Sequence, residues 1–148
     1  GMSKSPHIAL LGCGYRGKNL ARNLHELGAL RLVCDPAESG QAAAAESAPG
    51  VATSCEFNDA LKSVDIEAVV IATPAEIHFD LAAAPLNAGK DVFVEKSLAL
   101  QASEGGQLND LAQELGRVLM VGHLLEYHPA VVRLRVLVTG RVPECGRL

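Results

Sequence analysis

Short runs of consecutive apolar residues alternate with helical patterns along most of the chain. Each run is apolar at both odd and even positions, which is typical of strands buried under helices on both faces of a sheet. Between the runs, apolar residues recur at helical spacing. The predicted strands are His7–Leu11, Leu30–Cys34, a weaker Val51–Thr53, Ala68–Ala72, Asp91–Val94 and Val118–Val121. The predicted helices are Tyr15–Leu27, Ser39–Ser47, Asn58–Ser63, Ile77–Ala88 and Ala102–Leu115.

This alternation predicts an α/β fold with a doubly wound, mostly parallel sheet. We expect residues 1–6 to be a tag remnant with a disordered start, because Gly1 precedes Met2. Residues 7–126 should form the main domain. Residues 127–148 should form a last helix, which starts at Pro129 and ends before Gly140, and a tail.

Composition and charge narrow the class of protein. The chain has 148 residues, of which 49% are hydrophobic and 20% are charged, so it can bury a sizeable core. Thirteen basic against seventeen acidic residues give a net charge of −4, which argues against nucleic-acid binding. No uncharged stretch is long enough to span a bilayer, and no apolar signal core is present. We therefore expect a cytoplasmic protein without nucleic-acid or membrane partners.

The four cysteines, Cys13, Cys34, Cys55 and Cys145, show neither a CxxC pair nor zinc-site spacing. In a cytoplasmic protein the default is four reduced thiols. A redox pair of Cys13 with Cys34 is the alternative, because both residues would lie at neighbouring strand ends.

A glycine-rich segment, Gly12–Gly17 (GCGYRG), follows the first strand and opens the first helix. In this context GxGxxG is typical of a dinucleotide-binding (Rossmann) loop: the first glycine makes a tight turn, the second lets a pyrophosphate approach, and the third allows close packing. Free N–H groups at the helix start would face the phosphates. The alternative is a turn without a ligand. The phosphate-loop candidates are Gly12, Gly14, Tyr15, Arg16 and Gly17.

Asp35 closes the second strand, where the dinucleotide fold places an acid that binds the adenosine ribose. Its carboxylate would accept hydrogen bonds from both ribose hydroxyls and repel a 2′-phosphate. The next residues, Pro36, Ala37 and Glu38, include no cation. The sequence therefore favours NAD over NADP as cofactor. The alternative is that Asp35 only forms a turn or a helix cap before Pro36.

The middle of the chain carries further motifs: Val69–Pro74 (VVIATP), His78, Ala88–Lys96 (AGKDVFVEK) and Val121–His123 (VGH). Together with the glycine loop and Asp35, these motifs resemble the glucose–fructose oxidoreductase and inositol dehydrogenase family from about residue 7 to residue 140. The segment Gly122–Ala130 looks most like members that oxidise position three of UDP-N-acetyl-sugars.

The resemblance implies a nicotinamide-binding Rossmann half, followed in full-length members by a substrate half. It further implies an oxidoreductase that transfers a hydride between the nicotinamide and a hydroxyl of a sugar, nucleotide-sugar or polyol. Glu95 and Lys96 match the family's Glu-Lys-Pro motif, which makes Lys96 the candidate catalytic residue beside the substrate hydroxyl. The residues that the resemblance places around the dinucleotide are Thr73, Pro74, His78, Glu95, Lys96 and His123.

The sequence departs from the family pattern at several points. Ser97 replaces the motif proline, Pro85 lies inside a predicted helix, and Gly105 and Gly106 weaken the next helix. The chain stops at Leu148, where the substrate half should begin, so we expect that half to be absent and the chain alone to be inactive. A non-catalytic NAD-binding or interaction module is the alternative.

Two expectations concern the C-terminal segment. The predicted helix after Pro129 is apolar around most of its circumference, which favours a homo-oligomer formed through this helix; full packing against its own sheet is the alternative. A metal site built from His123, Glu126 and His128 fits no standard spacing, so we assign no metal.

Overall fold

A computed structural model describes residues 7–14, 17–73, 79–95 and 102–122. In these ranges it contains six strands and five helices, in the order that the sequence predicts. The strands are β1 (Ile8–Leu11), β2 (Leu30–Cys34), β3 (Ala52–Ser54), β4 (Ala68–Ile71), β5 (Asp91–Glu95) and β6 (Leu119–Gly122). The helices are α1 (Gly17–Glu26), α2 (Glu38–Ser47), α3 (Asn58–Lys62), α4 (Phe79–Asn87) and α5 (Ala102–Leu115).

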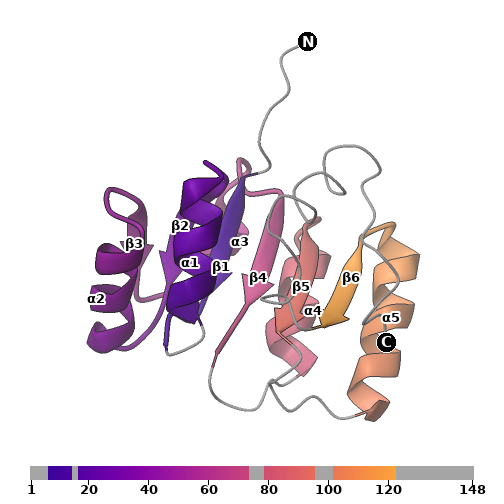
Figure 1. Ribbon diagram of the computed structural model, residues 1–148. Helices are drawn as coiled ribbons and strands as arrows, with labels where there is room; N and C mark the ends of the chain where they lie inside the picture. Colours follow the sequence, from indigo (N-terminus) through magenta and orange to yellow (C-terminus); the bar gives the residue numbers. More distant parts are fainter. Residues whose placement is uncertain (1–6, 15–16, 74–78, 96–101, 123–148) are drawn as a thin grey trace.

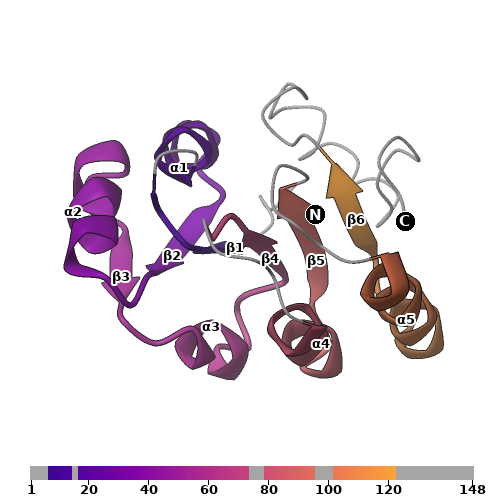
Figure 2. The same cartoon turned by 90° about the horizontal axis from the view of Figure 1, so that it is seen from below.

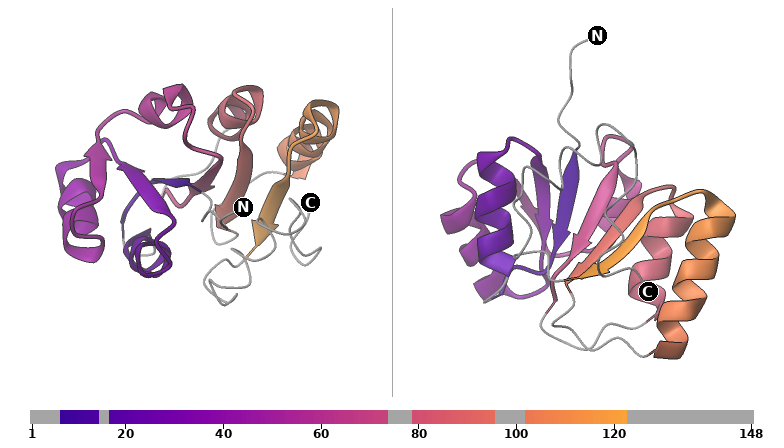
Figure 3. Two further views of the ribbon diagram at one scale, coloured as in Figure 1. Left: turned by 90° about the horizontal axis from the view of Figure 1, so that it is seen from above. Right: turned by 45° about the vertical axis from the view of Figure 1, so that its right-hand side comes forward.

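All six strands form one parallel sheet in the order β3-β2-β1-β4-β5-β6 (Figure 1). Strand β1 lies at the centre, with Leu11 opposite Cys34 of β2 on one side and Ile71 of β4 on the other. Helices α1 and α2 cover one face of the sheet, and α3, α4 and α5 cover the other (Figures 2 and 3). The predicted doubly wound parallel sheet is therefore confirmed.

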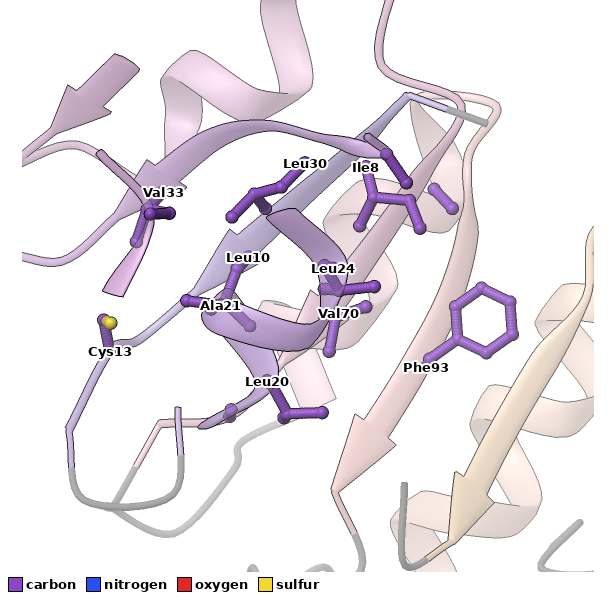
Figure 4. Close-up of a cluster of buried hydrophobic side chains, with 14 of the residues drawn as sticks. Ile8, Leu10, Cys13, Leu20, Ala21, Leu24, Leu30, Val33, Val70 and Phe93 are labelled. Atoms are coloured by element: carbon purple, nitrogen blue, oxygen red, sulfur yellow. The ribbon is translucent and has the colours of Figure 1, made fainter. Parts of the chain in front are cut away.

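The core lies in two apolar layers, one on each face of the sheet. On one face, Leu10 of β1 packs in a cluster with Leu20 and Leu24 of α1 (Figure 4). On the other face, Leu11 belongs to a second cluster with Leu86 of α4 and Leu108 of α5 among its members. Every residue of β1 and β4 is buried, because successive side chains point into opposite layers and both layers exclude water.

The helix-weakening residues noted in the sequence lie inside intact helices. Helix α4 continues through Pro85, where the backbone loses only the hydrogen bond that a residue-85 N–H would donate to the Leu81 carbonyl. Pro85 is buried and lines an apolar pocket of about 570 Å³ between α3 and α4. Helix α5 likewise runs through Gly105 and Gly106. None of the described helices combines the length and apolarity that crossing a bilayer requires.

A buried lysine lies at the edge of the sheet where β4 and β5 begin. Lys90 is only 4% exposed, and its Nζ donates hydrogen bonds of 2.7 Å to the carbonyl oxygens of both Ser63 and Ile66. Burial lowers the pKa of the Lys90 ammonium, because the charged form loses water. The two carbonyls compensate part of that cost, and the side chain thereby joins the α3–β4 connection to the start of β5.

Two of the cysteines are part of the core. Burial, together with the nearby Asp35 carboxylate, raises the pKa of the Cys13 thiol to about 11. Burial and the Asp59 carboxylate raise the pKa of Cys34 to about 11, while a backbone hydrogen bond with Ala60 acts in the opposite direction. Both thiols are free. Since the thiolate is the reactive form, these values make a redox pair of Cys13 with Cys34 unfavourable.

The first prediction tests the Lys90 contacts. Lys90→Met keeps the aliphatic chain but leaves the two carbonyl oxygens without their donor, so we expect a loss of about 1–3 kcal/mol in the free energy of unfolding. Urea denaturation followed by circular dichroism measures the change. Lys62→Met, on the exposed surface of α3, is the matched control and should change stability by less than about 0.5 kcal/mol. Equal effects of the two variants would contradict the role of Lys90.

The second prediction concerns thiol reactivity. At neutral pH, iodoacetamide should modify the exposed Cys55 and leave Cys13 and Cys34 unmodified in the folded protein, because a pKa of about 11 leaves almost no thiolate. Modification of the two buried thiols should rise only toward alkaline pH or in denaturant. Peptide mass spectrometry after labelling reads each site separately. A disulfide between Cys13 and Cys34 in that spectrum is the result that would contradict us.

Candidate functional site

The carboxyl ends of the strands meet at one edge of the sheet, because all strands run in the same direction. Helix α1 follows β1 toward one face of the sheet, whereas α4 follows β4 toward the other (Figure 2). The strand order therefore reverses between β1 and β4. In open α/β sheets, ligands bind in the crevice at such a reversal.

The glycine loop lies at this reversal, against the end of β4, and each of its three glycines meets different surroundings. Gly12 has a positive φ of 91°, and a Cβ there would lie 2.8 Å from the Thr73 Cα. A Cβ at Gly17 would lie 2.5 Å from the Gly12 carbonyl oxygen, so the start of α1 closes directly onto the loop. A Cβ at Gly14, in contrast, would meet no atom of the described residues within 4 Å. Two glycines are thus required by packing, and the third leaves the backbone open.

Asp35 connects the glycine loop to the start of α2. The side chain is only 8% exposed, and the Cys13 N–H donates a 2.8 Å hydrogen bond to its Oδ2. The Ala37 N–H donates a 2.9 Å hydrogen bond to Oδ1, which is the local turn that the alternative interpretation of this residue expected. A carboxylate has about four acceptor positions, so these two bonds leave capacity for further donors. The turn and a ribose contact are therefore compatible.

Two further candidate residues lie at the same edge. Thr73 follows β4 and is 7% exposed, and its hydroxyl is buried without a hydrogen-bond partner among the described residues. Glu95 is the last residue of β5, is 1% exposed, and lies opposite Gly122 of β6. The structure thus brings Gly12, Gly14, Gly17, Asp35, Thr73 and Glu95 to the carboxyl edge of one sheet.

The remaining candidates lie outside the described residues. The same holds for residues 1–6 and 123–148, and with them the predicted C-terminal helix, its self-association and the alternative metal site. Within the described ranges, no group of three or more His, Cys, Asp or Glu side chains is placed to hold a metal ion. The candidates concerned are Tyr15, Arg16, Pro74, His78, Lys96 and His123.

Gly40, the third residue of α2, is a residue of this site that the sequence pattern did not predict. Gly40 is buried, and any Cβ at this position would overlap the Asp35 carboxylate. The only local signal was a glycine in the first turn of an alanine-rich helix, where alanine is the better helix former.

Comparison with known proteins identifies the family. The model of an oxidoreductase family with an NAD-binding Rossmann fold matches residues 7–123. Inositol 2-dehydrogenase of Corynebacterium glutamicum is 30% identical over 151 residues, covering 99% of this chain and 44% of the relative. UDP-N-acetylglucosamine 3-dehydrogenase of Acidithiobacillus ferrooxidans is 32% identical over 126 residues, covering 85% and 39%. The chain thus spans about two fifths of these relatives.

A further relative and a solved structure are also similar to this chain. 2,7-Anhydro-N-acetylneuraminate hydratase of Mediterraneibacter gnavus is 31% identical over 148 residues, covering 96% of this chain and 39% of the relative. Among solved structures, GenD2 from gentamicin A biosynthesis in complex with NAD has a TM-score of 0.71 and 31% identity, covering 82% of this chain and 36% of that chain. The fold, the family match and the residues at the carboxyl edge agree: the chain belongs to the oxidoreductase family with an NAD-binding Rossmann fold.

Proposed function

We propose that this chain is the NAD-binding half of an oxidoreductase that acts on a hydroxyl of a sugar, nucleotide-sugar or polyol. The observation that carries the proposal is the Asp35 carboxylate, fixed beside the glycine loop where the strand order of the sheet reverses. The names of relatives support the substrate class, since one is an inositol dehydrogenase and another a UDP-N-acetylglucosamine dehydrogenase.

The residues at the carboxyl edge suit a dinucleotide. The space around Gly14 lets a pyrophosphate approach the backbone, and the N–H groups at the start of α1 carry the positive end of the helix dipole. The buried Thr73 hydroxyl is a polar group that a ligand in the crevice can satisfy. Together these features support binding of a phosphate-containing ligand next to β1 and β4.

Asp35 favours NAD over NADP. Its carboxylate can accept hydrogen bonds from the adenosine ribose hydroxyls and repels a 2′-phosphate. No lysine or arginine follows it, because the next three residues are Pro36, Ala37 and Glu38. A 2′-phosphate at this position would therefore meet a negative charge, and none of these three residues would supply a compensating cation.

The proposed catalytic residue is Lys96, which directly follows the last residue of β5 at the carboxyl edge. When bound, NAD supplies the nicotinamide that accepts or donates the hydride. The Lys96 ammonium would hydrogen-bond the substrate hydroxyl and stabilise the negative charge that develops on its oxygen as the proton leaves. This role comes from the family resemblance, as do those of Pro74, His78 and His123, whereas Tyr15 and Arg16 are proposed from the glycine-loop motif.

A non-catalytic dinucleotide-binding module is the second candidate function. It is favoured by Ser97, which stands where the family motif has a proline and removes a fixed φ next to Lys96.

The third prediction is that the chain binds NADH more tightly than NADPH. Asp35→Ala should weaken NADH binding by about ten- to a hundredfold, because hydrogen bonds to a charged group are lost, and it should narrow the preference over NADPH. Isothermal titration calorimetry with both cofactors measures this. Asp65→Ala, an exposed acid at the opposite edge, is the control and should leave both affinities unchanged. Tighter binding of NADPH by the unmodified chain would refute the assignment.

The fourth prediction is that the 148-residue chain shows little or no turnover by itself, since it spans only about two fifths of its relatives. A rigid substrate pocket and a second polar group are needed to align the hydroxyl with the nicotinamide. The assay follows NADH absorbance with a panel of UDP-sugars and polyols. Robust turnover that disappears in Lys96→Ala would show that the chain is a complete enzyme.

A further inference from the structure

Four hydrogen bonds hold Asp35, from three parts of the fold: its own N–H donates to the Ser54 carbonyl of β3 at 2.9 Å, and the other three come from the glycine loop and from α2. The Cys13 N–H of the glycine loop and the Ala37 N–H before α2 each donate to one carboxylate oxygen. The Gln41 side chain of α2 donates from Nε2 to the Asp35 backbone carbonyl at 3.1 Å. The position of the carboxylate is therefore set by where α2 begins and how closely it approaches.

Gly40 allows this close approach. It lies in the first turn of α2, and it and Ala44 are the buried residues of that helix. The three atoms nearest to a Cβ built at Gly40 are Oδ2, Cγ and Oδ1 of Asp35, all within overlap distance. Any other residue at position 40 would require the carboxylate or the helix to move.

The two backbone N–H groups that hold the carboxylate would otherwise form a small anion site. They converge from the glycine loop and from the start of α2, and a helix N-terminus carries the partial positive charge that favours an anion. In the structure the negatively charged Asp35 carboxylate occupies that site and accepts a hydrogen bond from each N–H group. A second anion, such as the 2′-phosphate of NADP, would meet this negative charge and would find both N–H donors already engaged.

We propose that Gly40 is a specificity-determining residue, which selects NAD over NADP by letting the Asp35 carboxylate occupy this site. Gly40 acts through Asp35 and is a positioning residue, not a ligand contact. The inference rests on the proposed dinucleotide binding and extends it to a residue outside the glycine motif. It also explains why α2 keeps a glycine where alanine would favour the helix.

The experiment is a double-mutant cycle with two readouts, thermal stability and the ratio of the NADPH and NADH dissociation constants. The variants are Gly40→Ala, Asp35→Ala and the combination of both, with Gly106→Ala as control. Gly106 lies inside α5, and a Cβ there meets no atom within 4 Å in the part of the chain that the structure describes, so its replacement should raise the melting temperature through helix propensity.

We expect Gly40→Ala to lower the melting temperature in the unmodified protein and to cost nothing once Asp35 is alanine, because the overlapping carboxylate is then absent. We expect Gly40→Ala to raise the dissociation constant of NADH about tenfold and to change that of NADPH by less than about threefold. The ratio of the NADPH to the NADH dissociation constant should therefore fall. If Gly40→Ala alone fails to fold, the double variant still tests the proposal, because it should fold as well as Asp35→Ala does.

Two results would overturn the proposal. One is a melting temperature that rises in Gly40→Ala as it does in Gly106→Ala, since the overlap with Asp35 would then be absent. The other is an unchanged ratio of dissociation constants despite the coupling in stability, which would reduce Gly40 to a packing residue. If the unmodified chain binds neither cofactor, the proposed function fails by itself, and the specificity proposal falls with it.

Discussion

The common direction of the six strands is the constraint on which the structure depends. A parallel sheet needs helical crossovers, and these crossovers cover both faces, so the central strands β1 and β4 are apolar and buried on both sides. The same direction brings all carboxyl strand ends to one edge. The sheet therefore separates two tasks: residues within the strands build the core, and residues just after them, such as Gly12, Asp35 and Thr73, form the candidate site.

The fold could be predicted from the sequence because its signals are local. Four consecutive buried residues in β1 and again in β4 appear directly as apolar runs, and α1 carries its buried leucines at helical spacing. Element ends were less certain by one or two residues. Helix α2, for example, begins at Glu38 before the predicted Ser39, and β3 is shifted by one residue toward the C-terminus. These ends are set by turns and neighbouring elements as well as by local preference.

The contacts that fix the site could not be predicted, because they join residues far apart in the chain. Lys90 bonds to a carbonyl 27 residues away, and Asp35 to a backbone N–H 22 residues away. Gly40 is only five residues from Asp35, yet its role depends on the angle at which α2 meets the end of β2. A pattern of residue types contains no such angle. The cofactor-binding roles assigned from the family resemblance, Lys96 above all, rest on that resemblance alone.

The anchoring of Asp35 by protein N–H groups has a further consequence. The carboxylate acquires its rotamer as the chain folds, so a ligand that uses it does not have to order it, an entropy cost of about 0.5–1.5 kcal/mol per immobilised side chain in other interfaces. Preorganisation of this kind couples ligand affinity to the local stability of α2. Fraying of the first turn of that helix would release the acid and weaken binding together, and a ligand that holds the acid would in turn hold the helix.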